Sequence, residues 1–437
     1  MKIKRIKLIL PLTVRYSAAK NEVRWRYPPY ALSLVAAYTP KDIEVEIVDE
    51  NVDVLNLDDR PDLVGISCVT ATSPQAYKIA DHYRGRGIPV VLGGKHPTAL
   101  PDEAIQHADA VVIGEAEYTW PELIDDFRSG NNKGIYKSDI FHDLKNLPLP
   151  RRDLLVKQKK KYDNFNTIQT TRGCPYDCEF CSTGIVSGRK IRTRPVGEVI
   201  TEIKTLQFDR IRPLIFWDDT INCVPDYASE LFQGLIPLGI KWGGYASVNM
   251  AKNEKLVALA RKSGCVGLFV GFESVSEESM KSLRKTTSID YDYHQVIDVF
   301  HKNGISLLGS FIFGLDGDGP MIFEKTYEFI KKSKLDSMYF NIVQPYPGTR
   351  MFDRLTDENR ILTNNWGEFF LDNPCFTPKN MSVEQLKEGY RWIYKQASQL
   401  TQTVKRMARV VTQRPESSLI MLAQNLGLRR TCRLIHS

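Results

Sequence analysis

The chain has 437 residues, 42% of them hydrophobic and 25% charged, which is ordinary for a soluble protein of two or three domains. No run of about 18 apolar residues occurs, and no small-residue cleavage site follows the opening apolar stretch, so we expect neither a membrane span nor a signal peptide. The formal charge is +7, and the tail 401–437 holds seven basic residues against one acidic residue, which leaves the rest nearly neutral. This distribution argues against a nucleic-acid-binding body.

The first third of the chain alternates strand and helix patterns. Short β-branched runs separated by helices are typical of βαβ units and a parallel sheet. The pattern therefore predicts an α/β fold that opens with a doubly wound, Rossmann-type parallel-sheet domain over residues 1–135. We expect its strands at 6–10, 45–48, 63–69, 90–92 and 110–113, and its helices at 30–38, 74–84 and 120–128.

A linker and a second alternating series follow. Proline pairs and a run of lysines over 136–164 predict the linker. Six strand–helix units over 165–370 predict a partial (β/α)6 barrel resembling a TIM barrel, with its helices outside because parallel crossovers are right-handed. We expect the strands at 167–171, 214–217, 242–246, 266–272, 306–313 and 338–344, with helices at 196–206, 227–235, 253–262, 291–303 and 323–332.

The C-terminal region, 371–437, contains only helical signals. Ser382 and Gln385 form a capping-box pattern at the start of one helix, and two more amphipathic helices are expected on either side of Pro415. Basic residues alternate with apolar ones in this tail. The alternation is compatible with contact to an anionic membrane surface, and equally with packing on the barrel below a solvated basic face.

Three cysteines lie close together in TTRGCPYDCEFCSTG, just after the first strand of the predicted barrel. A [4Fe–4S] cluster normally takes four thiolates, so Cys174, Cys178 and Cys181 would leave one iron open. The open iron can chelate the amine and carboxylate of S-adenosylmethionine (SAM). One electron from the reduced cluster then cleaves SAM and yields a 5′-deoxyadenosyl radical.

Other uses of these cysteines fit less well. A zinc ribbon would need a second Cys or His pair nearby, and none occurs in the sequence. The remaining five cysteines are scattered, and a chain of this length does not depend on disulfides, so we expect a reducing cytoplasm.

The loop CPYDCEFC, with Phe180 before its third cysteine, resembles the CxxxCxxC loop of the radical SAM superfamily. FWDDT (216–220), GFES (271–274), GSFIFGLDGD (309–318) and QPYPGT (344–349) are similar to segments of the subgroup that carries an N-terminal cobalamin-binding domain. That subgroup includes hopanoid methylases and anaerobic protoporphyrin cyclases. The resemblance covers nearly the whole chain, and the tail is covered least.

The resemblance also implies residues for SAM. At 218–220 this chain departs from the more common Gly-Gly-Glu, which leaves open which carboxylate meets the SAM amine. A helix N-cap is the alternative role for these residues. The residues implied for SAM are Phe180, Asp218, Asp219, Thr220, Glu273 and Ser274.

Ligands of open parallel sheets bind beyond the carboxyl ends of the strands. Here those ends carry small or polar residues, and GGKHPT (93–98) and GEAE (114–117) resemble segments of cobalamin-binding domains. An Asp-x-His-x-x-Gly loop is missing, so cobalt is expected to lack a histidine ligand, with His96 at the cofactor rim. No GxGxxG fingerprint for a dinucleotide occurs. The residues implied for cobalamin are Thr13, Ser67, Thr70, Gly93, Gly94, His96, Gly114 and Glu115.

Three functions remain open from sequence alone. The first is a cobalamin-dependent radical SAM methyltransferase that acts on an unactivated carbon. The second is a radical SAM oxidoreductase or cyclase without methyl transfer, with a vestigial cobalamin domain. The third is a non-catalytic iron–sulfur or cobalamin sensor. We expect a small-molecule or lipid substrate, an electron donor such as flavodoxin or ferredoxin, and a cytoplasmic location, with peripheral contact to the inner face of the membrane through the tail as a further expectation.

Overall fold

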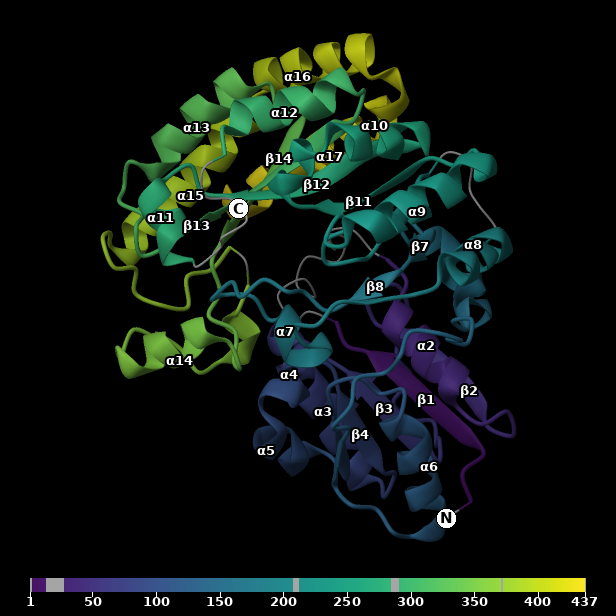
Figure 1. Ribbon diagram of the computed structural model, residues 1–437. Coiled ribbons are helices and arrows are strands. Elements are labelled where there is room, and N and C mark those ends of the chain that lie inside the picture. Colours follow the sequence, from purple (N-terminus) through teal and green to yellow (C-terminus); the bar gives the residue numbers. More distant parts are fainter. Residues whose placement is uncertain (1, 13–26, 207–211, 284–290, 371, 437) are drawn as a thin grey trace.

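The computed structural model describes residues 2–12, 27–206, 212–283, 291–370 and 372–436, so Thr13 lies outside the described residues. Two parallel sheets form the body of the molecule, one in each domain, and the tail helices lie on the far side of the second sheet (Figure 1). The α/β fold expected from sequence is confirmed. No helix among these residues combines the length and the hydropathy that a membrane crossing requires.

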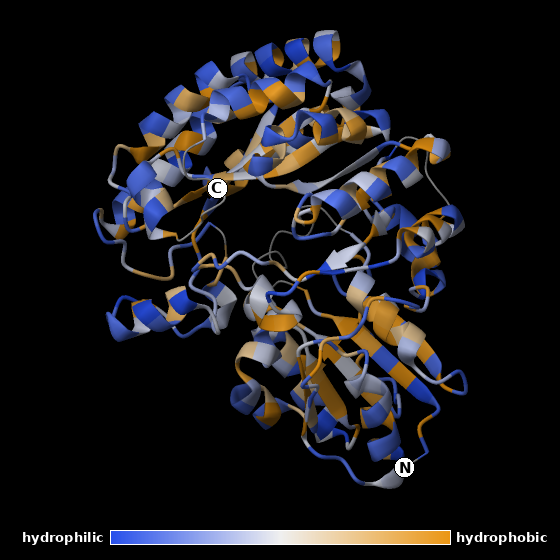
Figure 2. Cartoon of the chain, in the orientation of Figure 1, coloured by the Kyte–Doolittle hydropathy of each residue, from blue (hydrophilic) through white to orange (hydrophobic). Residues whose placement is uncertain are grey.

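The N-terminal sheet has six parallel strands in the order β2-β1-β3-β4-β5-β6. Helices α2 (Tyr30–Tyr38) and α6 (Thr119–Ser129) cover one face and α3 (Ser73–Gly85) the other, which gives two separate hydrophobic clusters. Because both faces are covered, the strands are mostly hydrophobic (Figure 2). The strands are β1 (Arg5–Leu10), β2 (Glu44–Asp49), β3 (Leu63–Ser67), β4 (Val90–Gly93), β5 (Ala110–Ile113) and β6 (Ile135–Lys137).

The stretch expected as a linker is structured at both ends. Its first residues belong to β6, which pairs with β5 and was not expected from sequence. Further on, the 3-10 helix η3 (Arg152–Lys161) leads into Tyr162, and the side chains of Leu155 and Tyr162 are buried in the core of the N-terminal domain. This stretch therefore packs against the first domain.

The second sheet has six parallel strands in the order β14-β13-β12-β11-β10-β7. Within the described ranges the edge strands β7 and β14 do not pair with each other, so the sheet forms the open, partial barrel that was expected. Helices cover its outer face (Figure 1). The strands are β7 (Thr167–Ile168), β10 (Leu214–Phe216), β11 (Trp242–Ala246), β12 (Cys265–Glu273), β13 (Ser306–Phe313) and β14 (Ser337–Ile342), and the outer helices are α8 (Val196–Thr205), α9 (Pro225–Leu235), α10 (Glu254–Lys262), α12 (Tyr293–Lys302) and α13 (Ile322–Ser333).

Three helices complete the chain, as the sequence predicted. In α15 (Val383–Ala397) the Ser382 side chain accepts from the Gln385 N–H and the Gln385 side chain accepts from the Ser382 N–H, which confirms the capping box. Helices α16 (Leu400–Gln413) and α17 (Ser418–His436) are separated at Pro415.

The tail packs against the ends of the barrel strands that lie away from the cysteines. Arg414 is buried, and its Nη2 lies 2.6 Å from Oδ1 of Asp336, the residue before β14. The Asn425 amide donates to the Asp336 carbonyl at 2.9 Å. Met421 lies against Gly267 near the start of β12, with its Cε 3.2 Å from where a Cβ would stand. Part of the basic tail is thus internal to the fold and cannot face a partner.

Candidate active site

The three clustered cysteines lie on one loop, between β8 (Thr171–Arg172) and α7 (Thr183–Ser187). The Cys174 N–H donates to the Gly188 carbonyl at 3.3 Å, and the Cys181 N–H donates to the Cys178 carbonyl at 3.1 Å. None of the three forms a disulfide, and Cys181 is exposed. Three thiols on one loop are the donor set that a [4Fe–4S] cluster with one open iron requires, so the residues fit that group.

The structure does not bring the donors into a closed metal site. Within the part of the chain that it describes, no three His, Cys, Asp or Glu side chains are close enough together to hold a metal ion. The Cys223 thiol hydrogen-bonds to that of Cys174, and this bond is the largest cause of the raised pKa of Cys223. Cys223 was not expected near the cluster loop.

The side chain of Asp218 stabilises the turn between β7 and β8, which leads into the cysteine loop. Its carboxylate accepts hydrogen bonds from the Thr170 and Thr171 N–H groups and from the Thr170 hydroxyl, each at 2.7 Å. The side chain is buried, and burial raises its pKa to about 6 although these hydrogen bonds oppose the shift. The turn interrupts the strand expected over 167–171: β7 stops at Ile168, and β8 pairs antiparallel with β9 (Arg192–Thr193).

The neighbouring carboxylate has a different environment. Asp219 is exposed, and its Oδ1 accepts from the Thr183 hydroxyl at 3.2 Å, at the start of α7. The Thr220 hydroxyl donates to the Asp219 carbonyl at 2.6 Å. Of the two carboxylates at the end of β10, Asp219 is therefore the one that lies beside the helix following the cysteine loop.

Glu273 ends β12 in an unusual backbone conformation. Its φ is 60°, in the left-handed region, at a register shift between β12 and β13, and its side chain is buried. A non-glycine residue in this region costs about 1–3 kcal/mol, and such strain is concentrated at functional sites. Next to it, the Ser274 hydroxyl accepts from the Ser276 N–H at 3.1 Å. Phe180, in the cysteine loop, packs against the barrel core.

A cavity of about 600 Å³ lies at the carboxyl ends of β1, β3, β4 and β5, facing the barrel. It is lined by Ser67, Gly93, Gly94, Gly114 and Glu115, but Thr70 and His96 are not part of its wall. The sequence did not predict that the cavity extends into an apolar interior between the sheet and the helices, or that the second domain forms part of its rim. The apolar interior is lined by residues such as Leu8, Val91 and Trp120, and the second domain contributes Gln169, Arg172 and Trp217 to the rim.

The wall of the cavity contains two glycines with positive φ. At Gly94, with φ +100°, a Cβ would lie 2.6 Å from the Cys68 carbonyl, so a larger residue would strain the loop. At Gly114, with φ +81°, a Cβ would lie 3.8 Å from the Val186 carbonyl, its nearest neighbour among the described residues. Glycines at the rim, which have no side chain, and an apolar interior fit a broad, flat macrocycle that carries an aromatic tail, as cobalamin does.

His96 belongs to a buried polar cluster. Its Nε2 lies 3.1 Å from Oε1 of Glu103, which also accepts from the Tyr77 hydroxyl at 2.8 Å and the Trp366 indole N–H at 3.0 Å. Burial raises the pKa of Glu103, but the hydrogen bonds from His96, Tyr77 and Trp366 outweigh it and lower the pKa to about 2. Through Glu103, this cluster joins the N-terminal domain to a segment beyond the barrel.

Buried ion pairs connect the cavity to the cysteine loop. Arg172, two residues before Cys174, lies 2.5 Å from Glu117 and 3.4 Å from Glu115 through Nη1. Arg192 binds Glu115 through both terminal nitrogens, each at 2.7 Å. Burial lowers the pKa of Arg172, but Glu117 and Glu115 outweigh it and raise the pKa. Glu115 thus lines the cavity while its carboxylate is engaged by the second domain.

Aromatic residues follow one another on the inner face of the barrel sheet. Ring centroids are 5.7 Å apart between Trp217 and Tyr245, 5.2 Å between Tyr245 and Phe269, and 6.5 Å between Phe269 and Tyr339. On β12, Phe269 of this series is followed and preceded by residues that point to the other face, such as Leu268, which packs in the core shared with the outer helices. The inner face is therefore largely apolar, and Trp217 belongs both to this aromatic series and to the cavity rim.

Comparison with known proteins agrees with this architecture. Residues 16–124 match the model of the B12 binding domain, and residues 168–330 that of the Radical SAM superfamily. The chain is 32% identical to bacteriochlorophyllide d C-12(1)-methyltransferase of Chlorobaculum tepidum over 386 residues, which cover 87% of this chain and 84% of that protein. It is 25% identical to an anaerobic magnesium-protoporphyrin IX monomethyl ester cyclase of Rubrivivax gelatinosus, over 88% of this chain and 76% of the cyclase.

A solved structure shares the fold. The cobalamin-dependent SAM radical enzyme OxsB, with aqua-cobalamin bound, superposes with a TM-score of 0.70 at 16% identity, over 100% of this chain and 75% of its own. The chain therefore belongs to the radical SAM enzymes that carry a cobalamin-binding domain, as the cysteine loop and the two sheets indicated. Within them it is a cobalamin-dependent methyltransferase, and its cofactors are a [4Fe–4S] cluster, SAM and cobalamin.

Proposed function

We propose that the protein methylates an unactivated carbon of an apolar macrocycle of the tetrapyrrole class. The observation that carries this proposal is the position of Trp217, which lines the cavity of the first domain and begins the aromatic series of the second. A flat apolar substrate bound there lies beside both cofactor sites and out of water. The substrate in the name of the Chlorobaculum tepidum relative supports the same class.

The site residues divide into three proposed roles. When bound, the reduced cluster supplies the electron that cleaves SAM, and cobalamin supplies the methyl group. Cys174, Cys178 and Cys181 ligate the cluster, and Phe180 shields it from water. Asp219 binds the ammonium group of SAM, because its carboxylate is exposed whereas that of Asp218 is buried in the turn. Thr220, Glu273 and Ser274 complete the SAM site, and Ser67, Gly93, Gly94, Gly114 and Glu115 contribute the rim for the corrin.

The test is product analysis with the reconstituted enzyme, SAM, a reductant and a bacteriochlorophyllide under anaerobic conditions. We expect a product heavier by one methylene, together with equal amounts of 5′-deoxyadenosine and S-adenosylhomocysteine. Loss of hydrogen or a new ring without added carbon would indicate an oxidoreductase or cyclase. Methylation of a hopanoid but not of the tetrapyrrole would show that the substrate class is wrong.

A variant test addresses the proposed substrate surface. Trp217→Ala should weaken binding of the tetrapyrrole to the cobalamin-loaded protein, measured by quenching of its fluorescence, while the cluster content stays unchanged. Trp392→Ala is the matched control, because Trp392 lies on α15, beyond the outer face of the barrel. Equal binding by both variants would contradict the role of Trp217.

The reductant is proposed to be a one-electron carrier such as flavodoxin or ferredoxin. The exposed Cys181 supports this, because electron transfer needs the cluster near the surface. The test is reduction of the reconstituted cluster by each carrier under anaerobic conditions, followed by electron paramagnetic resonance.

We also propose that the tail contributes weak contact with an anionic membrane surface. The packed side of α16 and α17 is internal, but the outer side carries both apolar and basic groups, a combination that favours interfacial binding. The exposed large apolar and basic residues of this outer side are Leu400, Val404, Lys405, Val411, Leu419, Leu422, Leu426, Arg430 and Arg433.

Charge reversal on this outer side tests the membrane contact without disturbing the packed side. The combined change of Lys405, Arg430 and Arg433 to Glu should reduce co-sedimentation with phosphatidylserine vesicles at low salt. The same change at Lys41, Lys78 and Lys137, three exposed lysines of the N-terminal domain, is the control and should have a smaller effect. No sedimentation of the unchanged protein would rule the contact out.

A further inference from the structure

Glu179 stands between two proposed cluster ligands, Cys178 and Cys181, and three contacts from other elements hold it. Its N–H donates to the Leu283 carbonyl at 3.3 Å, and its carbonyl accepts from the Met351 N–H at 3.2 Å. Its carboxylate pairs with Arg354, with 2.6 Å between Nε and Oε1 and 3.3 Å between Nη2 and Oε2. Both Met351 and Arg354 belong to α14 (Arg350–Asp357).

A second arginine of the same helix binds the other acidic residue of the loop. Arg350, one turn before Arg354, pairs with the carboxylate of Asp177, and its Nη2 donates to the Asp177 carbonyl at 2.5 Å. Asp177 directly precedes Cys178 in the chain. The two carboxylates on either side of Cys178 are thus each neutralised by an arginine of α14.

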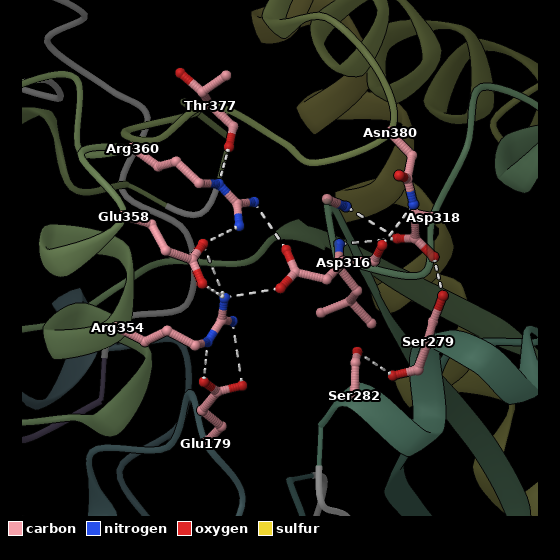
Figure 3. A network of polar contacts seen from close by, with 12 residues as sticks. Glu179, Ser279, Ser282, Asp316, Asp318, Arg354, Glu358, Arg360, Thr377 and Asn380 are labelled. Atoms are coloured by element: carbon pink, nitrogen blue, oxygen red, sulfur yellow. Dashed lines mark hydrogen bonds and ion pairs between the residues drawn. The ribbon is translucent and has the colours of Figure 1, made fainter.

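Arg354 is also the junction of a larger network (Figure 3). Its Nη1 lies 2.8 Å from Asp316 and 3.2 Å from Glu358. Arg360 pairs with the same two acids, at 2.8 and 2.6 Å, but Figure 3 shows no contact between Arg360 and Glu179. The network joins the cysteine loop to the segment after β13, and Arg354 is its link to the loop.

We propose that Arg354 is a positioning residue that neutralises Glu179 and thereby keeps the cluster reducible. A [4Fe–4S] cluster becomes more negative when it takes up an electron, and its reduction potential depends on nearby charge. A carboxylate between two ligand cysteines opposes that step unless a cation compensates it. Only 12% of the Glu179 side chain is exposed, so water screens its charge poorly.

The test is the reduction potential of the reconstituted cluster, measured by redox titration with detection by electron paramagnetic resonance. Arg354→Gln should shift the potential to more negative values at an unchanged iron and sulfide content. The double variant Glu179→Gln with Arg354→Gln should return the potential towards that of the unchanged protein, because the net charge of the network is then the same as in the unchanged protein. Arg360→Gln is the matched control, because it removes the same charge from a residue that does not pair with Glu179, and it should shift the potential less.

Two results would overturn the proposal. One is an unchanged potential in Arg354→Gln with a fully loaded cluster. The other is a double variant whose potential stays as negative as that of Arg354→Gln, which would assign the effect to loop geometry instead of charge. If Arg354→Gln does not load a cluster, the single variant Glu179→Gln tests the proposal instead. Removal of the carboxylate should shift the potential to more positive values. An unchanged potential in this variant would refute the charge argument.

Discussion

Arg172 and Glu117 form a buried ion pair across the boundary between the two domains, with 2.5 Å between Nη1 and Oε1. Arg172 lines the cavity proposed for cobalamin and stands two residues before the first cysteine of the cluster loop. One buried ion pair therefore connects the wall of this cavity to the start of the cysteine loop.

Removal of one partner of this pair should be costly. Arg172→Gln leaves a buried carboxylate uncompensated, which we expect to cost about 3–5 kcal/mol of stability and to lower cobalamin retention. Denaturant unfolding and the visible spectrum of bound cobalamin measure the two effects. Arg84→Gln is the control, because the Arg84–Asp109 pair is about one third exposed and should contribute less than about 1 kcal/mol. Similar losses in both variants would contradict the importance of the buried pair.

The proposed ligand set predicts the effect of single cysteine changes. Cys174→Ala, Cys178→Ala and Cys181→Ala should each abolish the cluster and with it SAM cleavage, measured as iron content and 5′-deoxyadenosine. Cys265→Ala should retain both, because Cys265 is buried in the barrel core. Loss of the cluster in Cys265→Ala would undermine the assignment of ligands. Cys223 is a poor control, because its thiol contacts that of Cys174.

Cobalt should lack a histidine ligand in this protein. His96 does not line the cavity, and its Nε2 is engaged by Glu103. Electron paramagnetic resonance of the Co(II) form should show no nitrogen superhyperfine splitting from an axial base, and His96→Gln should leave the spectrum unchanged. A splitting that disappears in His96→Gln would prove the opposite.

Asp218 should make stability depend on pH in an unusual direction. Its pKa rises from 3.8 to about 6 in the fold, so its protonated form is the one that the fold favours. Its contribution to stability is therefore greatest below pH 4 and is lost as the pH rises through 6, by about 3 kcal/mol. Asp218→Asn cannot ionise, so the free energy of unfolding of the unchanged protein should fall relative to this variant between pH 4 and 7. The same pH dependence of the free energy of unfolding in both proteins would contradict this prediction.

Much of the fold could be predicted from the sequence, because its strands are short β-branched runs and its outer helices are amphipathic. The exceptions depend on contacts between distant residues. β6 has three residues and carries no periodicity of its own, so only its pairing with β5 makes it a strand. The break after Ile168 needs the carboxylate of Asp218, 50 positions later.

The candidate site could likewise be predicted in part from the sequence. Spacing alone identifies the cysteine loop, since all three residues lie within one short segment. The orientation of a side chain at a strand end could not be predicted, and the structure separates Asp218, which is buried in a turn, from Asp219, which is exposed. Arg414 looked like a surface residue because its partner, Asp336, is 78 positions away.

The tyrosines of α15 have a consequence for association between copies. The hydroxyls of Tyr390 and Tyr394 donate to the Phe340 carbonyl at 3.1 and 3.0 Å, and the Phe340 N–H donates to Tyr394 at 3.4 Å. Phe340 lies in the middle of β14, at the edge of the open barrel, where unpaired backbone groups would accept a strand from another molecule. Because helix side chains satisfy these groups, a second chain cannot extend the sheet at this point, and the barrel stays open without exposing a surface for strand-by-strand aggregation there.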